Sequence, residues 1–150
     1  MLPFYYARHK STDTASKEIV SEMLNLLNSK EVWIDRIKHD QIISITSHLP
    51  HLISTALVGV AKENYGIAEI MGMAAGGFDG ATRLTRTNPE MIKDMYDTNS
   101  QNINLFLKHF IDELMNLMNL QDSDELINYL NNSVEWRRAL SEKFGERPLS

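Results

Sequence analysis

Residues 39–62 read HDQIISITSHLPHLISTALVGVAK, and this stretch decides the fold. At helical spacing its large apolar side chains occupy every side instead of one stripe. A helix that is apolar all round is typical of a buried position. The stretch therefore predicts a buried helix at the centre of the domain. The apolar side chains are those of Ile42, Ile43, Ile45, Leu49, Leu52, Ile53, Leu57, Val58 and Val60.

The same helix carries ionisable and polar groups. At 100° per residue, Asp40, Ser47 and His51 fall within about 40° of one another, and His48 lies one step round. An unpaired polar group costs on the order of 1–3 kcal/mol to bury. Pro50 also removes a backbone donor, which predicts a kink. We interpret this cluster as a ligand site, although bonding of these groups to one another or to nearby backbone is an open alternative.

Outside this stretch, the sequence predicts mostly helix. Strand-like fragments at 2–7 and 32–34 flank a helical pattern, so residues 1–35 indicate a short α/β segment. From residue 36 on, the patterns predict helices at 66–77, from Asn88-Pro89-Glu90 and after 122–124, with a loop over 77–87. The fold class is all-α, with about five or six helices over 36–150. The apolar stripe over 103–117 predicts a twofold dimer formed by the long helices.

Composition excludes several functional classes. The chain has 150 residues, a formal charge of −5 and no cysteine. An acidic chain lacks the clustered cations of a nucleic-acid binder, and without cysteine there is no disulfide, thiolate metal site or thiol nucleophile. The sequence has no uninterrupted apolar run of the roughly 20 residues that span a membrane. We expect a soluble, cytoplasmic protein.

A second candidate segment is Ala75-Gly76-Gly77-Phe78-Asp79-Gly80-Ala81-Thr82-Arg83. Its glycines permit close backbone approach or positive φ. Arg83 is a fixed cation that can grip a carboxylate with two parallel hydrogen bonds. A flexible loop with a surface arginine is an equally good interpretation of this segment alone.

Together, these motifs resemble the prephenate dehydrogenase family. The similarity rests on His39-Asp40, on Ser47-His48-Leu49-Pro50-His51, on the Gly76-to-Arg83 segment and on Asn88-Pro89-Glu90-Met91. The resemblance implies oxidative decarboxylation of prephenate to 4-hydroxyphenylpyruvate with NAD or NADP, in tyrosine biosynthesis. It also implies that residues 1–35 are the end of a dinucleotide-binding domain and that 36–150 form the helical dimerisation domain.

The resemblance also assigns roles to residues. It implies that Arg83 binds a substrate carboxylate, that His51 contacts the substrate, and that Ser47 and His48 line the pocket. It implies a backbone contact at Gly76 and a positioning role for His39 and Asp40.

Other parts of the family's machinery have no counterpart in this sequence. The family's catalytic histidine and the Gly-x-Gly-x-x-Gly cradle are absent from these 150 residues. The resemblance therefore implies a C-terminal fragment that binds no cofactor and no metal and is inactive alone. The family also implies a homodimer and tyrosine as a possible inhibitor.

Two positions depart from the family pattern. The family's basic-Asp pair after Gly-Gly-Phe is Asp79-Gly80 here, and its tryptophan is Ile92. The missing aspartate is one that would orient the arginine or reach the partner's pocket, so the departure bears on substrate binding.

Two alternatives remain open. A stand-alone helical dimer that binds an aromatic acid, such as a tyrosine sensor, would use the same pocket without chemistry. An HD-type metal-dependent phosphohydrolase would use His39, Asp40 and His48-x-x-His51 as ligands.

Overall fold

The computed structural model describes residues 6–7, 13–29, 33–120 and 122–144. Within them lie seven α-helices, a π-helical segment, a 3₁₀ segment and two short strands. Six of the α-helices follow residue 35, so the predicted all-α class with an α/β N-terminus is confirmed. The chain divides into two compact units, Met1–Leu107 and Lys108–Ser150.

The N-terminal segment is a strand, a helix and a strand. β1 (Tyr6–Ala7) and β2 (Trp33–Ile34) pair in parallel, and α1 (Thr14–Leu26) lies between them in sequence. Parallel strands need a crossover connection, which α1 supplies. Asp13 starts α1 by accepting a hydrogen bond from the amide of Ser16 at 2.9 Å. The other predicted strand residues, 2–5 and 32, lie outside the described residues.

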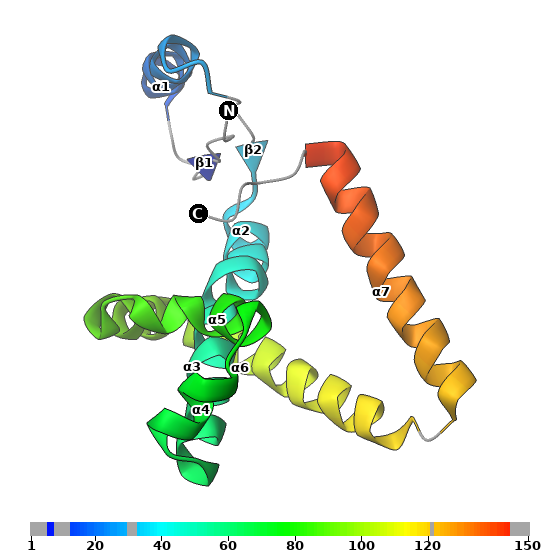
Figure 1. The fold of residues 1–150 in the computed structure, drawn as a ribbon. Helices are drawn as coiled ribbons and strands as arrows, with labels where there is room; N and C mark the ends of the chain where they lie inside the picture. Colours follow the sequence, from blue (N-terminus) through cyan, green and yellow to red (C-terminus); the bar gives the residue numbers. More distant parts are fainter. Residues whose placement is uncertain (1–5, 8–12, 30–32, 121, 145–150) are drawn as a thin grey trace. The chain divides into compact units, whose positions relative to one another are not determined.

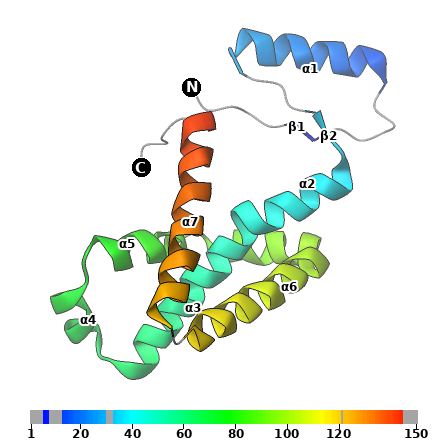
Figure 2. The ribbon, with the colours of Figure 1, turned by 90° about the vertical axis from the view of Figure 1, so that its right-hand side faces the viewer.

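The central stretch forms one continuous helical rod (Figure 2). It consists of α2 (Arg36–Ile43), the π-helical segment η1 (Ser44–His48) and α3 (Leu49–Asn64). Asp35 caps its start by accepting hydrogen bonds from the amides of Ile37 and Lys38. The π segment ends just before Pro50, and the amide of Leu49 donates to the Ser44 carbonyl five residues back. The missing donor of Pro50 is thus accommodated by a wider turn.

The prediction that this rod is buried all round is wrong for the single chain. Ser44, Leu49 and Ser54 are its buried residues, whereas Ile42 is 42%, Ile45 47% and Val60 59% exposed. The other helices of one chain cover only part of its circumference. Averaged over 18 residues, Arg36–Asn64 is also apolar and long enough to cross a membrane. The search for an uninterrupted apolar run did not find this helix, because polar residues interrupt it. The core helix of a soluble protein can reach the same average hydropathy and length.

The segment predicted as a small-residue helix and a loop is divided differently. α4 covers Ile67–Met73, α5 covers Gly76–Thr82, and the 3₁₀ segment η2 covers Arg83–Arg86. The predicted loop over 77–87 is therefore mainly helical. Both α5 and η2 pack against α3, and this packing overrides the low helix propensity of the glycines. Thr82 is nearly buried and donates its hydroxyl to the Phe78 carbonyl at 2.7 Å.

The two long C-terminal helices begin where the sequence predicts. In α6 (Pro89–Asn119) the side chain of Asn88 accepts from the Glu90 amide, and before α7 (Ser123–Phe144) Asp122 accepts from the Asp124 amide. The sequence did not predict the break in α6, where Asn99 adopts φ −139° and ψ 26°. The helix changes direction there (Figure 1).

The core of the first unit lies beside this break. Ile103, on the turn after Asn99, is 1% exposed. Its inclusion in the predicted dimer stripe is therefore wrong, because the fold of one chain already buries it. The later members of the stripe remain exposed, as Leu114 does at 44%.

Candidate functional site

The break in α6 brings Asn99 against the central rod. Its side-chain amide donates to the backbone carbonyl of Asp40 at 2.7 Å and lies 3.5 Å from Nδ1 of His48. Asn102, one turn further on, donates to the side-chain oxygen of Asn99 at 2.8 Å. Residues that are 51 and 59 positions apart in sequence are thus joined in one polar network.

This network pairs Asp40 with His48 and leaves Ser47 out. In a regular α-helix, Ser47 would lie on the same face as Asp40, because seven residues make about two turns. A π-helical turn takes up about one extra residue, so the residue eight positions on comes to that face. The half-buried Ser47 makes no side-chain hydrogen bond within the described part of the chain.

His39 and Asp40 form a pair at the start of the rod. Nδ1 of His39 lies 3.0 Å from Oδ1 of Asp40, and their side chains are 31% and 43% exposed. The Asp40 carboxylate stays open to solvent while its backbone carbonyl is held by Asn99. This arrangement agrees with a positioning role and leaves that role a prediction.

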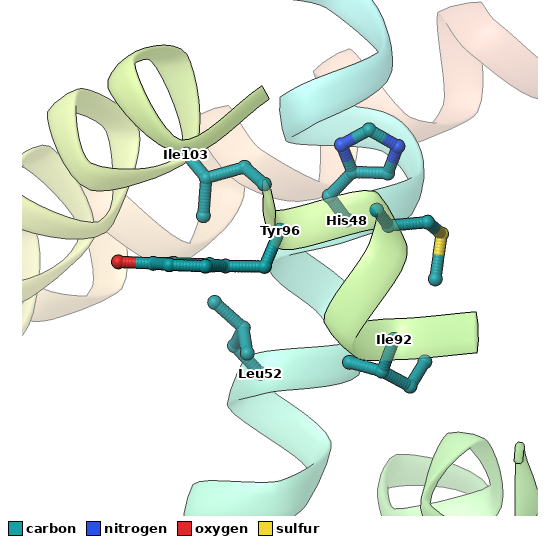
Figure 3. A pocket seen from close by; sticks show the side chains of 6 residues that line it. His48, Leu52, Ile92, Tyr96 and Ile103 are labelled. Atoms are coloured by element: carbon teal, nitrogen blue, oxygen red, sulfur yellow. The ribbon is translucent and has the colours of Figure 1, made fainter. Parts of the chain in front are cut away.

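Apolar residues line the other side of His48. His48 and Leu52 from the rod, with Ile92, Met95, Tyr96 and Ile103 from α6, line a small cavity of about 10 Å³. In Figure 3 the ring of Tyr96 lies between Ile103 and Leu52, and His48 borders the same space. A cavity of this size holds about one water molecule, whereas small-molecule sites usually measure about 300–1,000 Å³. The described residues alone therefore do not enclose a small-molecule site.

Further along α3 lie two polar atoms without partners. Nδ1 of His51 and the hydroxyl of Ser54 are buried and make no hydrogen bond within the described chain. They are three residues apart and so lie on one side of the helix. Leaving such groups unpaired costs on the order of 1–3 kcal/mol each. The substrate contact that the resemblance implies for His51 stays a prediction, because this nitrogen is buried in the single chain.

Burial lowers the pKa of His48, and the neighbouring His51 and His39 lower it further, while Asp40 opposes them. A lowered pKa favours the neutral imidazole at pH 7. His48 is therefore suited to hydrogen bonding with a ligand as a neutral ring.

This pKa shift predicts a pH dependence of stability. The unfolded chain binds a proton at His48 more readily than the folded chain does, so acidification favours unfolding. The contribution of His48 is fully present above about pH 6.5, the ordinary histidine pKa, and is lost as pH falls toward the lowered value. The free energy of unfolding, measured with urea, should fall less between pH 7.5 and pH 5 in His48→Gln than in the wild type. Equal declines in both proteins would contradict this assignment.

Arg83 makes no hydrogen bond to the histidine network within the described residues. Arg83 opens η2, is exposed, and makes no hydrogen bond or ion pair among the described residues. Its neighbour Arg86 donates to Asp79 at 3.2 Å in an exposed ion pair. Asp79, which stands at the family's basic position, therefore pairs with Arg86 and leaves the Arg83 guanidinium available.

The glycines of this segment are open. A methyl group added to Gly76 or Gly80 would meet nothing within 4 Å, and neither residue has positive φ. Within this chain, therefore, neither close backbone approach nor positive φ explains these glycines. The backbone contact predicted at Gly76 would have to be made to a ligand or another chain.

Within the described residues, no three His, Asp or Glu side chains come together as a metal site. His39 and Asp40 are adjacent, but no further acid joins them. The phosphohydrolase interpretation therefore lacks the ligand cluster on which it would depend.

Sequence reasoning missed Asn99, the residue that connects the site. Its signal was weak, because Thr98-Asn99-Ser100 is a run of poor helix formers inside a long amphipathic pattern. Such a run marks a possible break, but only the structure reveals that the break faces Asp40 and His48.

The fold and the site together define a helical domain in which a network of Asn99, Asp40 and His48 lies beside a small, mainly apolar cavity. The sequence model of the family "Prephenate dehydrogenase, dimerization domain" matches residues 35–132. This chain belongs to that family.

Three relatives illustrate the similarity. Cyclohexadienyl dehydrogenase of Zymomonas mobilis is 31% identical over 136 residues, which are 87% of this chain and 44% of that protein. Prephenate dehydrogenase of Bacillus subtilis is 26% identical over 138 residues, 87% of this chain and 36% of that one. The chain thus spans less than half the length of these relatives.

The third relative has a solved structure. Prephenate dehydrogenase of A. aeolicus, in complex with hydroxyphenyl propionate and NAD+, superposes with a TM-score of 0.83 at 24% identity. The match covers 91% of this chain and 49% of that one. At this identity the likeness is one of fold.

Proposed function

We propose that this chain is the C-terminal, substrate-binding and dimer-forming part of a prephenate dehydrogenase. The complete enzyme would convert prephenate to 4-hydroxyphenylpyruvate by oxidative decarboxylation, with NAD or NADP as the oxidant, in the cytoplasm. The observation that carries the proposal is the family match over residues 35–132, which contains the whole network of Asp40, His48 and Asn99.

The chemistry of prephenate suits the groups that the chain leaves unpaired. Prephenate is a dianion with two carboxylates and a ring hydroxyl. The unpaired guanidinium of Arg83 would bind a carboxylate, and the unpartnered Nδ1 of His51 would meet a polar group of the substrate. Ser47 and His48 would line the same pocket, Gly76 would offer its backbone, and His39 with Asp40 would hold the start of the rod in place.

The residues of this chain do not fit the nicotinamide cofactor. A dinucleotide cradle needs a glycine-rich turn after the first strand of its domain, and no Gly-x-Gly-x-x-Gly occurs in these 150 residues. We therefore derive no step through NAD. The parallel pairing of β1 with β2 supports the proposal that residues 1–35 are the end of a dinucleotide-binding domain.

The exposed apolar surface supports a homodimer. On α6, Ile111, Leu114, Met115 and Met118 are 44–81% exposed and repeat at helical spacing. A contiguous apolar face of this kind marks an interaction surface. The family's dimerisation role supplies the occupant, a second copy of the chain.

Calorimetric titration of the 150-residue chain tests the proposal. Prephenate should bind saturably, and the chain with NAD should produce no NADH. Binding of tyrosine without any binding of prephenate would overturn the proposal in favour of an aromatic-acid sensor. NADH formation by the chain alone would contradict its predicted inactivity.

A further inference from the structure

The carboxamide of Asn99 has only one orientation that satisfies its neighbours. Its nitrogen lies 2.7 Å from the Asp40 carbonyl oxygen, which can only accept a hydrogen bond. Its oxygen accepts from the Asn102 amide group at 2.8 Å. Exchanging the nitrogen and the oxygen would place oxygen against oxygen at Asp40, so the Asp40 carbonyl fixes the orientation and the Asn102 contact is compatible with it.

This orientation determines what His48 can do. The Asn99 nitrogen also lies 3.5 Å from Nδ1 of His48, and an amide nitrogen is only a donor. Nδ1 is therefore placed to accept, which favours the neutral ring with its proton on Nε2. Nε2 of His48 has no hydrogen-bond partner among the described residues, and the ring borders the pocket in Figure 3.

The backbone of α6 is shaped around this contact. Asn99 leaves helical geometry with φ −139°, and the helix then resumes with Asn102 and Ile103 on the next turn. The break directs the Asn99 side chain at the junction of α2 and η1, where the π turn has brought His48 to the face of Asp40.

We propose that Asn99 is a positioning residue that holds His48 as its neutral Nε2–H tautomer, so that His48 presents one hydrogen-bond donor to an oxygen atom of the ligand. The identity of that ligand as prephenate rests on the function proposed above, whereas the tautomer does not. The charged and titratable groups that bear on His48 are Asp40 and His39 on α2 and His51 on α3.

Nitrogen-15 NMR of the histidine rings in the 150-residue chain tests the tautomer directly. The signals of His48 are identified by their loss in His48→Gln. At pH 7.5 the wild type should show Nε2 protonated and Nδ1 bare. Predominance of the Nδ1–H form in the wild type would overturn the proposal, and this result needs no variant to fold.

Asn99→Asp supplies the reciprocal test. A carboxylate only accepts hydrogen bonds, so it should draw the proton to Nδ1, reverse the tautomer and raise the pKa of His48. The charge-matched control is Gln101→Glu, which adds a carboxylate at an exposed position two residues away on the same helix. It should leave the tautomer unchanged. An unchanged tautomer in a folded Asn99→Asp chain, or the same reversal in Gln101→Glu, would overturn the proposal.

Prephenate titration separates this inference from the proposed function. In Asn99→Asp the donor at Nε2 is lost, so prephenate should bind at least tenfold more weakly, while Gln101→Glu should bind like the wild type. If the wild type shows the Nε2–H tautomer but does not bind prephenate, the proposed function fails and the role of Asn99 in positioning His48 stands. Equal affinity in Asn99→Asp and wild type would refute the presentation of a donor to the ligand.

Discussion

Leu114→Glu is expected to convert the proposed dimer into monomers. Leu114 is 44% exposed in the single chain, and on the same face of α6 Ile111 is 48% and Met118 81% exposed. A twofold interface uses the same patch on both subunits. One substitution therefore removes two leucine side chains, one from each subunit, that the dimer would bury. At about 1.5 kcal/mol or more for each side chain, the dissociation constant should rise at least roughly a hundredfold. Burial of the new charge adds to this loss.

Sedimentation equilibrium at micromolar concentration measures the effect. The control is Asn119→Glu, which adds the same charge to an exposed position about 140° round the helix from Leu114. The control should remain dimeric. A wild type that sediments as a monomer, or a Leu114→Glu chain that stays dimeric, would contradict the assignment of this face.

Arg83→Ala should abolish most of the affinity for prephenate without destabilising the fold. Arg83 is exposed and has no ion-pair or hydrogen-bond partner in the described part of the chain, so its loss leaves no group unpaired there. A charge-assisted hydrogen bond is worth about 1.5–3 kcal/mol, which corresponds to a loss of affinity of roughly 10- to 150-fold. Calorimetric titration measures the affinity, and thermal unfolding measures the stability.

Arg86→Ala is the matched control for this experiment. It removes the same charge three residues away, but from a guanidinium already engaged with Asp79 at 3.2 Å in an exposed pair. Such pairs contribute little to stability. We expect a change in prephenate affinity of less than about threefold, within 1 kcal/mol. Equal losses in both variants would indicate general attraction of the dianion instead of a specific contact at Arg83.

Several elements followed from local signals in the sequence. The starts of α6 and α7 were predictable because Asn88 and Asp122 accept hydrogen bonds from amides two residues on, which is a local property. The parallel β1–α1–β2 segment was predictable from its pattern of strand, helix and strand. The helicity of α5 was not, since the packing of α5 against α3 outweighs the low helix propensity of its glycines.

The candidate site divides in the same way. The sequence predicted Asp40, Ser47, His48 and His51 as one polar cluster on an apolar helix. It placed the wrong residue on the face of Asp40. A regular helical wheel puts Ser47 there, whereas the wider turn of η1 before Pro50 puts His48 there. Asn99 lies 59 residues from Asp40, and no local pattern encodes that contact.

By itself, the sequence determined the helical class, the α/β N-terminus and the identity of the ionisable residues, because these depend on composition and on neighbours a few positions apart. Only the tertiary structure decided which of these residues meet. The contacts of Asn99 with Asp40 and His48 and the burial of Ile103 arise where α6 packs against the central rod. Packing of this kind joins distant segments, and its energy depends on contacts that no short window of sequence contains.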